Sequence, residues 1–359
     1  MTQTNLYDVG LTDRFAQEAT MFEGLYLGRV SIQHRDLYKV ITENGEITAE
    51  VSGKLAFLAK DSTDYPAVGD WVMVDRVENS GGYAIIHHIL RRKSIFQRKA
   101  AGTSLESQIV AANIDTVFIC MSLNNNFNLR RLERYLSIAW DSMATPVVVL
   151  TKADLCTDID AKLAEVSSVA LGVDVLVTTS MQDDGYTAVS NYLGHGKTIA
   201  FIGSSGVGKS TLINRLLDQD FLATREIDGA DKGRHATTRR QLIVLPMGGV
   251  VIDTPGMREL QLESVDLAKS FADIEELAQH CRFNDCTHQK EPGCAVREAL
   301  SKGLLSAARL ESFKKLQIEM NYQGLNSRQI EQEKLNRMFS DLGGMKQARN
   351  FIKEKSKRK

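Results

Sequence analysis

The chain has 359 residues, of which 43% are hydrophobic and 25% charged, and its formal net charge is -1. This length suits two or three domains, and the near-zero charge excludes a protein that is basic throughout, so any nucleic-acid surface must be local. No apolar run approaches the roughly 18 residues that span a bilayer. Residues 1–8 lack a signal-peptide pattern, so we expect a cytoplasmic protein without membrane contact.

The N-terminal part of the chain predicts a small β-barrel. Residues 1–23 are polar and are expected to form a loose or helical leader. From 24 to 99 apolar and polar residues alternate in short runs, as in half-buried strands, and Asn44-Gly45 predicts a tight hairpin. The five predicted strands are residues 27–33, 37–43, 46–52, 71–75 and 83–90. They indicate an OB-fold that binds RNA on one face, with an SH3-like barrel or a protein-contact module as the alternative.

The end of the barrel is basic, with Arg91, Arg92, Lys93, Arg98 and Lys99 close together. These residues favour a phosphate-rich partner, and a solvated charged surface is the alternative interpretation. Residues 99–106 are small and polar and predict a linker to an α/β domain over residues 107–262. Its alternating strands and helices indicate a mostly parallel, doubly wound sheet with ligand at the carboxyl ends of the strands.

A guanine-binding motif ends one of these strands. The apolar run 147–150 leads into Thr151-Lys152-Ala153-Asp154, a variant of the Asn-Lys-x-Asp motif of GTPases. A carboxylate at Asp154 can accept both N1–H and the exocyclic N2–H₂ of guanine, donors that adenine does not present in that arrangement. The motif therefore predicts selection of GTP. Ser180, after the next strand, occupies the place of a GTPase element whose backbone contacts guanine O6.

A phosphate-binding loop is the strongest motif of the chain. The apolar strand 198–202 leads into Gly203-Ser-Ser-Gly-Val-Gly-Lys209-Ser210, and a helical pattern begins at Thr211. With this spacing, backbone N–H groups and a helix N-terminus surround phosphate oxygens. Lys209 would reach the outer phosphates, and the Ser210 hydroxyl would ligate Mg²⁺.

A third motif and the order of all three identify the class of nucleotide site. The strand 249–253 ends in Asp253-Thr-Pro-Gly256, the Asp-x-x-Gly element that GTPases place beside magnesium and the γ-phosphate. An ordinary GTPase has the phosphate loop first, then switch one, Asp-x-x-Gly and the guanine motif. Here the guanine motif comes first. The order predicts a circularly permuted GTPase.

Switch one must lie in residues 219–240, between the phosphate loop and Asp-x-x-Gly. Thr238 is the favoured metal-sensing residue, with Thr237 as the other candidate. Met257 follows Asp-x-x-Gly where many GTPases have a glutamine that orients the attacking water, and methionine cannot form that hydrogen bond. His235 is the nearest substitute, and a solvated loop histidine is the alternative.

Three of the five cysteines lie with a histidine in one short segment, Cys281-x₄-Cys286-x-His288-x₅-Cys294. Three thiolates and one imidazole complete a tetrahedral Zn²⁺ site with no open position, which indicates a structural metal. Reduced cysteines in a small core are the alternative. We expect one zinc ion per chain, in a helical zinc-binding domain over residues 263–322. The basic tail, 323–359, predicts either a solvated terminus or a contact with RNA phosphates.

A barrel, a permuted GTPase and a Cys₃His segment in this order resemble the ribosome small-subunit-dependent GTPase A (RsgA) family. The resemblance extends from Gly24 to Ala299 and depends chiefly on residues 203–211, 233–238 and 253–256 and on the Cys/His segment. It implies an OB domain, a circularly permuted GTPase domain and a C-terminal zinc-binding domain. It also implies GTP hydrolysis stimulated by the small ribosomal subunit, with rRNA binding, during late maturation of that subunit in the bacterial cytoplasm. We expect a monomer.

These predictions assign residues to a GTP site, its magnesium and switch elements, and a zinc site. The residues predicted to bind GTP are Thr151, Lys152, Ala153, Asp154, Ser180, Gly203, Ser204, Ser205, Gly206, Val207, Gly208, Lys209, Ser210 and Thr211. Ser210, Thr238, Asp253 and Gly256 are predicted at the magnesium ion and the switches, and His235 is the catalytic candidate. Zinc would be bound by Cys281, Cys286, His288 and Cys294.

Two departures from common patterns affect these predictions. Thr151 stands where asparagine is usual among GTPases, which removes an amide contact and predicts weaker guanine binding. Ala236 interrupts a run that the family more often has as three threonines, so the switch-one ligand stays open.

Two other functions are weighed against a GTPase. One is a nucleotide-gated RNA-binding module with incidental hydrolysis, which Met257 supports. The other is a P-loop kinase or ATPase, which Asp154 and Asp253 oppose.

Overall fold

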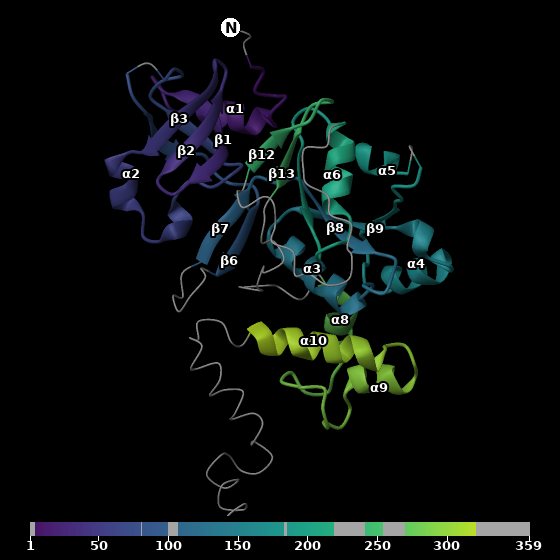
Figure 1. Ribbon diagram of the computed structural model, residues 1–359. Helices are drawn as coiled ribbons and strands as arrows, with labels where there is room; N and C mark the ends of the chain where they lie inside the picture. Colours follow the sequence, from purple (N-terminus) through teal and green to yellow (C-terminus); the bar gives the residue numbers. More distant parts are fainter. Residues whose placement is uncertain are drawn as a thin grey trace, which may run out of the picture.

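The computed structural model describes residues 4–79, 81–99, 107–182, 185–218, 241–253 and 270–320. Figure 1 shows a β-barrel, an α/β unit around a central sheet, and a group of helices at the far end of the α/β unit from the barrel. No helix within the described ranges is long and apolar enough to cross a membrane.

The barrel consists of five strands that enclose a small apolar core. Their order is β1-β2-β3-β5-β4, and β4 pairs with β1 to close the barrel. β3 and β5 are parallel, and the other neighbours are antiparallel. The OB-fold prediction is confirmed. The elements are β1 (Tyr26–His34), β2 (Leu37–Thr42), β3 (Gly45–Val51), α2 (Gly53–Leu58), η1 (Ser62–Asp64), β4 (Trp71–Val74) and β5 (Ala84–Ile89).

The expected leader contains one short helix, and its described part packs into the core of the protein. It contains α1 (Asp13–Ala19), and its apolar side chains Leu6, Val9, Leu11 and Phe15 are buried. Its backbone also hydrogen-bonds to the turns of the α/β unit, because the Tyr7 and Asp8 carbonyls accept from Gly196 and Gly249 N–H, each at 3.0 Å. The leader therefore closes the space between the barrel and the central sheet.

The central sheet has the order β10-β9-β8-β11-β13-β12. Neighbouring strands are parallel except for β12, which is antiparallel to β13. The strand that precedes the phosphate loop, β11, lies in the middle, between β8 and β13. The strands are β8 (Thr116–Ser122), β9 (Thr145–Thr151), β10 (Asp174–Val177), β11 (Thr198–Ile202), β12 (Gln241–Val244) and β13 (Val250–Asp253).

The two faces of the sheet have separate cores. Along β8, Val117, Ile119 and Met121 join the core that includes α3 and α4, whereas Phe118 and Cys120 join the core of α5 and α6. Helices thus cover both faces, and the doubly wound prediction is confirmed. These helices are α3 (Leu129–Asp141), α4 (Ile159–Ser167), α5 (Thr187–Ser190) and α6 (Lys209–Leu217), and η2 (Ala153–Leu155) is a 3₁₀ turn after β9.

The barrel and the central sheet are joined into a single eleven-stranded sheet, because β1 pairs antiparallel with β12 at Ile32 and Gln241. Strands also flank the predicted linker: β6 (Ile95–Lys99) and β7 (Ser107–Ala112) form a separate antiparallel pair. The linker prediction missed both. Val110 and Ala111 of β7 are buried, so the connection between the barrel and the α/β unit is packed into the core.

Arg29 of β1 is fully buried between the barrel and the central sheet. Its guanidinium donates to the Val9 and Gly69 carbonyls and, at 2.9 Å, to Thr198 Oγ1, and it lies 5.2 Å from the centroid of the Trp71 ring. Burial lowers the pKa of Arg29 to about 10, which leaves it charged at neutral pH. Because Thr198 begins β11, this contact fixes the barrel to the strand that leads into the phosphate loop.

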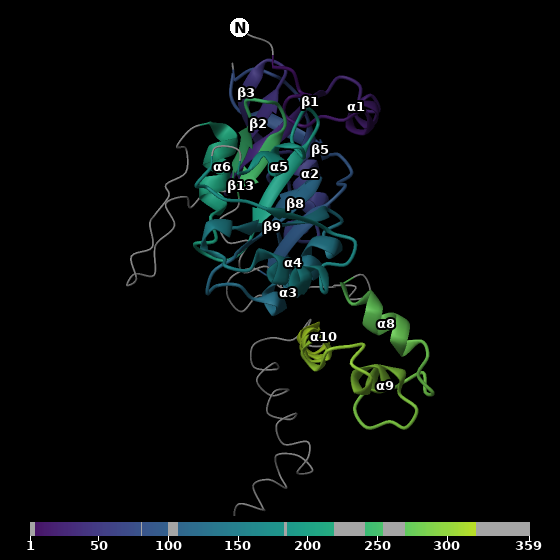
Figure 2. The ribbon, with the colours of Figure 1, turned by 90° about the vertical axis from the view of Figure 1, so that its right-hand side faces the viewer.

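The C-terminal helices are α8 (Ala272–Ala278), α9 (Ala295–Ser301) and α10 (Ala307–Met320). Phe271 and Phe313 lie at the centre of their core, with ring centroids 5.3 Å apart. α10 contacts α3, and Figures 1 and 2 both place it directly below the α/β unit. The C-terminal helices are therefore docked on one helix of the α/β unit.

Candidate nucleotide and metal sites

The phosphate loop connects β11 to α6, as predicted. Gly203, Gly206 and Gly208 all have positive φ angles, +145°, +72° and +95°. A Cβ atom on Gly203 would lie 2.4 Å from the Cys120 carbonyl oxygen of the neighbouring strand. Only glycine fits such a backbone without strain, so the glycine spacing found in the sequence is a requirement of the loop.

Lys209 opens α6 and folds back over this loop. Its Nζ donates to the Gly203 and Ser204 carbonyls, each at 2.7 Å. Asp253, at the end of β13, lies beside it. Burial raises the pKa of Asp253, and the Lys209 ammonium partly offsets this effect. The structure therefore brings together the cation of the phosphate loop and the carboxylate of the Asp-x-x-Gly element.

The guanine motif lies at the end of β9, two strands from β11. Lys152 has left-handed backbone angles, φ 57° and ψ 43°, which turn the chain into η2 and leave Asp154 exposed. The Asp154 carboxylate accepts a hydrogen bond from the Thr179 hydroxyl at 2.7 Å, and the Thr179 hydroxyl also accepts from Met181 N–H at 3.1 Å. The sequence predicts Ser180 as the contact in this segment, and it gives no signal for Thr179, whose side chain is oriented only by the fold.

Thr151 connects the guanine motif to the phosphate loop. Its hydroxyl donates to the Val207 carbonyl at 2.5 Å, and the side chain is buried. The sequence predicted a lost contact at this position. The structure places a hydrogen bond there, between the residue before Lys152 and the middle of the loop.

Several predicted site residues lie outside the described ranges: the switch residues His235, Thr237 and Thr238, and Gly256 and Met257. Ser205 is exposed at the tip of the phosphate loop. Ser210 and Thr211 lie in the first turn of α6.

Two of the basic residues at the end of the barrel are engaged within the fold. Arg92 forms a bidentate pair with Asp70, at 2.7 and 2.9 Å, and its side chain is 12% exposed. Lys93 Nζ lies 2.5 Å from Asp115. Arg92 is thus held within the barrel, and Lys93 ties the barrel to the α/β unit, so neither side chain is free for the predicted phosphate contact.

The cysteine segment folds into a compact ligand set. The ligand atoms of Cys281, Cys286, His288 and Cys294 all lie within 4.8 Å of one another. Sγ of Cys281 is 3.9 Å from Sγ of Cys294, and His288 Nδ1 lies 3.7 and 3.4 Å from these two sulfurs. Metal–sulfur bonds of about 2.3 Å and metal–nitrogen bonds of about 2.0 Å require tetrahedral edges of about 3.8 and 3.5 Å. The four residues therefore fit a tetrahedral metal ion.

The backbone around the cluster supports ligation. Burial tends to raise the pKa of the Cys281 thiol, but hydrogen bonds from the Val296 and Ala295 N–H groups and from neighbouring thiols bring it below its ordinary value. Cys294 also caps α9, with its sulfur accepting from Arg297 N–H at 3.5 Å. The thiolate, which is the form that binds metals, is thereby favoured at Cys281, whereas burial raises the pKa of Cys286 to about 11.

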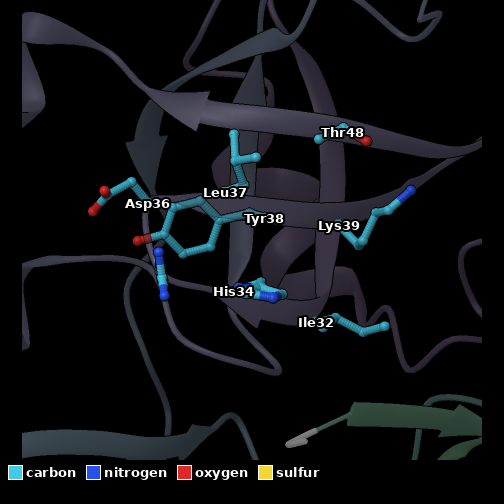
Figure 3. A pocket seen from close by; sticks show the side chains of 8 residues that line it. Ile32, His34, Asp36, Leu37, Tyr38, Lys39 and Thr48 are labelled. Carbon is cyan, nitrogen blue, oxygen red and sulfur yellow. The ribbon is translucent and has the colours of Figure 1, made fainter.

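A pocket of about 410 Å³ opens on the barrel, where β1, β2 and β3 meet (Figure 3). Figure 3 shows His34 and Ile32 on one side and Tyr38 and Lys39 above them. Burial raises the pKa of Tyr38 to about 12, so its hydroxyl stays protonated. The lining residues are Ile32, His34, Arg35, Asp36, Leu37, Tyr38, Lys39 and Thr48.

Comparison with known proteins agrees with this architecture. Residues 89–263 match the RsgA GTPase family. The chain is 54% identical to a small ribosomal subunit biogenesis GTPase RsgA 2 of Lactiplantibacillus plantarum, over 98% of both chains. It is 44% identical to a small ribosomal subunit biogenesis GTPase RsgA of Opitutus terrae, over 88% of this chain and 90% of that protein.

Solved structures show the same fold. YjeQ from Thermotoga maritima superposes with a TM-score of 0.60 at 27% identity, covering 82% of this chain and 98% of that one. YloQ, described as a circularly permuted GTPase, superposes with a TM-score of 0.59 at 24% identity, covering 83% of this chain and 96% of that one. With the motif order, the sheet topology and these relatives in agreement, the chain belongs to the RsgA GTPase family.

Proposed function

We propose that this protein hydrolyses GTP and acts in biogenesis of the small ribosomal subunit. The observation that carries the proposal is the convergence of Lys209, Asp253 and Asp154 at the carboxyl ends of β11, β13 and β9. Ligands bind at this edge of a doubly wound sheet. The part played in the small subunit is inferred from the names of the relatives that match nearly the whole chain.

Each part of the site has a proposed task. The Lys209 ammonium exchanges its two loop carbonyls for phosphate oxygens, and the N–H groups of residues 203–211 surround the same phosphates. The Asp154 carboxylate accepts the guanine N–H donors, and Ser180 lies beside the base. Ser210 and Thr238 would ligate Mg²⁺, which neutralises phosphate charge when it is bound with GTP.

Three further residues complete the proposed catalytic arrangement. Asp253 and Gly256 would sense the magnesium ion and the γ-phosphate. His235 is proposed to orient the attacking water, because Met257 cannot. Because Asp253 precedes the C-terminal helices in the chain, a nucleotide-dependent change at Asp253 would then be passed on to those helices.

We further propose that the Cys₃His cluster holds one structural zinc ion. The tetrahedral edge lengths and the closed set of four ligands support zinc, and they leave no position for a substrate. Cys286 and His288 would fix the loop before α9, and Cys281 and Cys294 would fix the ends of the adjoining helices.

Partners and domain limits are proposed on the same basis. The OB barrel, residues 24–99, would bind rRNA of the small subunit, with the pocket beside Tyr38 as a surface for an unstacked base. The GTPase domain would span 107–262 and the zinc-binding domain 263–322, flanked by the leader 1–23 and the basic tail 323–359. A cytoplasmic monomer is the expected form.

The test is the rate of GTP turnover by the purified protein with small subunits, with large subunits and with neither. We expect stimulation by small subunits alone, and loss of turnover in Lys209→Ala. Equal rates in all three conditions would reject the role at the small subunit. Turnover that persists in Lys209→Ala would reject the nucleotide site.

A further inference from the structure

α3 connects the phosphate loop to the C-terminal helices. It begins at Leu129, capped by Asn128, whose side chain accepts from Arg131 N–H at 3.0 Å. Its first turn lies against the loop after β11, and its outer side carries α10 (Figures 1 and 2). The contacts at both ends of this connection are made by charged side chains.

At the nucleotide end, Arg131 and Asn126 clamp the phosphate loop. Arg131 Nη1 donates to Ser204 Oγ at 2.9 Å and to Asn126 Oδ1 at 2.7 Å. Asn126 Nδ2 donates to the same Ser204 hydroxyl at 3.0 Å. The Ser204 carbonyl in turn accepts from Lys209. Ser204 is therefore held by its side chain from α3 and by its backbone from the phosphate-binding lysine.

Arg131 has no carboxylate partner within the part of the chain that the structure describes. Its positive charge lies against the phosphate loop, in contact with the Ser204 side chain. A guanidinium in that place both orients the loop and contributes to the positive potential at the site.

At the other end, Glu133 is buried beneath the C-terminal helices, with 1% of its surface exposed. It accepts from Arg309 Nη1 of α10 at 3.0 Å, from Ser312 Oγ at 2.5 Å and from Arg130 at 2.6 Å. Arg309 is 4% exposed and forms a bidentate pair with Asp273 of α8, at 2.6 and 2.7 Å. Such a network resists sliding, because displacement would leave buried charges unpaired.

Arg309 also contacts the backbone just before α8. Its Nη2 donates to the Ser270 carbonyl at 2.9 Å. Glu133 and Arg131 are two positions apart on one helix, so a shift of α10 that moves Glu133 must move Arg131 as well. The two ends thus share a rigid element.

We propose that α3 couples the C-terminal helices to the nucleotide, with Arg131 as a positioning residue for the phosphate loop and the Glu133–Arg309 pair as the opposite contact. The proposal rests on the proposed GTP site. When the C-terminal helices are docked as in this structure, Arg131 holds Ser204 and the loop binds nucleotide tightly. A partner that displaces those helices loosens the loop and speeds nucleotide release.

The first test replaces Arg131 by methionine, which keeps the length of the side chain and removes its donors, and measures binding of fluorescent GDP and GTP analogues. We expect Arg131→Met to weaken both by about tenfold, mainly through faster dissociation, since a charge-assisted hydrogen bond is lost. Arg131→Lys should recover part of the affinity. Arg76→Met, at a half-buried arginine of the barrel that pairs with Asp75, is the matched control and should bind as the wild type does.

The second test examines the coupling. Glu133→Gln keeps the shape of the side chain and removes its charge, and Ser312→Ala removes a single hydrogen bond to Glu133 if the first variant folds poorly. Each should weaken nucleotide binding several-fold in the wild-type background and have less effect in the Arg131→Met background, with a zinc content equal to that of the wild type.

The outcomes separate the two proposals. Additive effects on affinity, or no effect of Arg131→Met, would overturn the coupling. If Lys209→Ala also binds nucleotide normally, then the proposed GTP site itself is wrong.

Discussion

The hydroxyl of Thr151 should control nucleotide affinity through its contact with the phosphate loop. It donates to the Val207 carbonyl at 2.5 Å, and the peptide that carries this carbonyl also carries the N–H of Gly208. In a phosphate loop such N–H groups face the phosphates. Thr151 therefore holds one peptide plane in the orientation that presents its N–H to the ligand, and Gly208, with φ +95°, has little steric resistance to rotation.

Thr151→Val removes the hydroxyl and keeps the shape of the side chain. A buried carbonyl without a partner costs about 1–3 kcal/mol. If the peptide between Val207 and Gly208 rotates so that its carbonyl finds another donor, its N–H no longer faces the phosphates. The cost then falls on nucleotide binding, and the dissociation constant for GDP should rise about 5- to 150-fold. Titration with a fluorescent GDP analogue measures the change, and thermal unfolding of the free protein measures any part that falls on stability.

Two conservative variants make the test specific. Thr151→Ser keeps the donor, and Thr151→Asn places an amide donor within reach of the same carbonyl, so both should bind GDP within a few-fold of the wild type. Binding by Thr151→Val within twofold of the wild type, with an unchanged unfolding midpoint, would refute the reasoning.

Three other predictions follow from the proposed sites. Asp154→Asn should bind GTP more weakly and prefer xanthosine nucleotides, because its amide presents a donor where guanine also has donors; competition binding with both nucleotides decides this. Cys286→Ser should lose stoichiometric zinc in elemental analysis and expose the C-terminal helices to protease while nucleotide still binds. Full zinc content in that variant would contradict the ligand assignment. His235→Ala should bind GTP and small subunits normally and lose roughly 10²–10³-fold in stimulated turnover. Normal stimulated turnover would assign the water to rRNA or another residue.

The parts that were predictable from the sequence are those encoded by local pattern. The glycines of residues 203–208 predicted the phosphate loop because only glycine tolerates its φ angles. Alternation predicted the five barrel strands, although the two-residue turn falls at Glu43 and Asn44, one position before the predicted dipeptide. The cysteine spacing predicted a ligand set that the structure brings within tetrahedral distances.

What could not be predicted depends on contacts between distant segments. The sequence predicted that Thr151 loses the contact an asparagine would make, because its actual acceptor, the Val207 carbonyl, lies 56 residues away. The sequence favoured a phosphate-rich partner for Arg92 and Lys93, because local pattern does not show that the fold supplies their carboxylate partners. The buried residues of the leader were missed because Leu6, Val9 and Phe15 are too widely spaced in polar sequence to show a period.

The place of β11 in the central sheet has a consequence for synthesis of the chain. β8, β9 and β10 are translated before β11, so the nascent half-sheet presents β8 as an open edge until residues 198–202 emerge and cover it. The barrel, whose own core is complete by Ile89, can fold much earlier. The barrel cannot yet attach to the central sheet at that stage, because the acceptor for Arg29 is Thr198, which is synthesised 169 residues later. Vectorial synthesis therefore separates formation of the barrel from its attachment to the sheet.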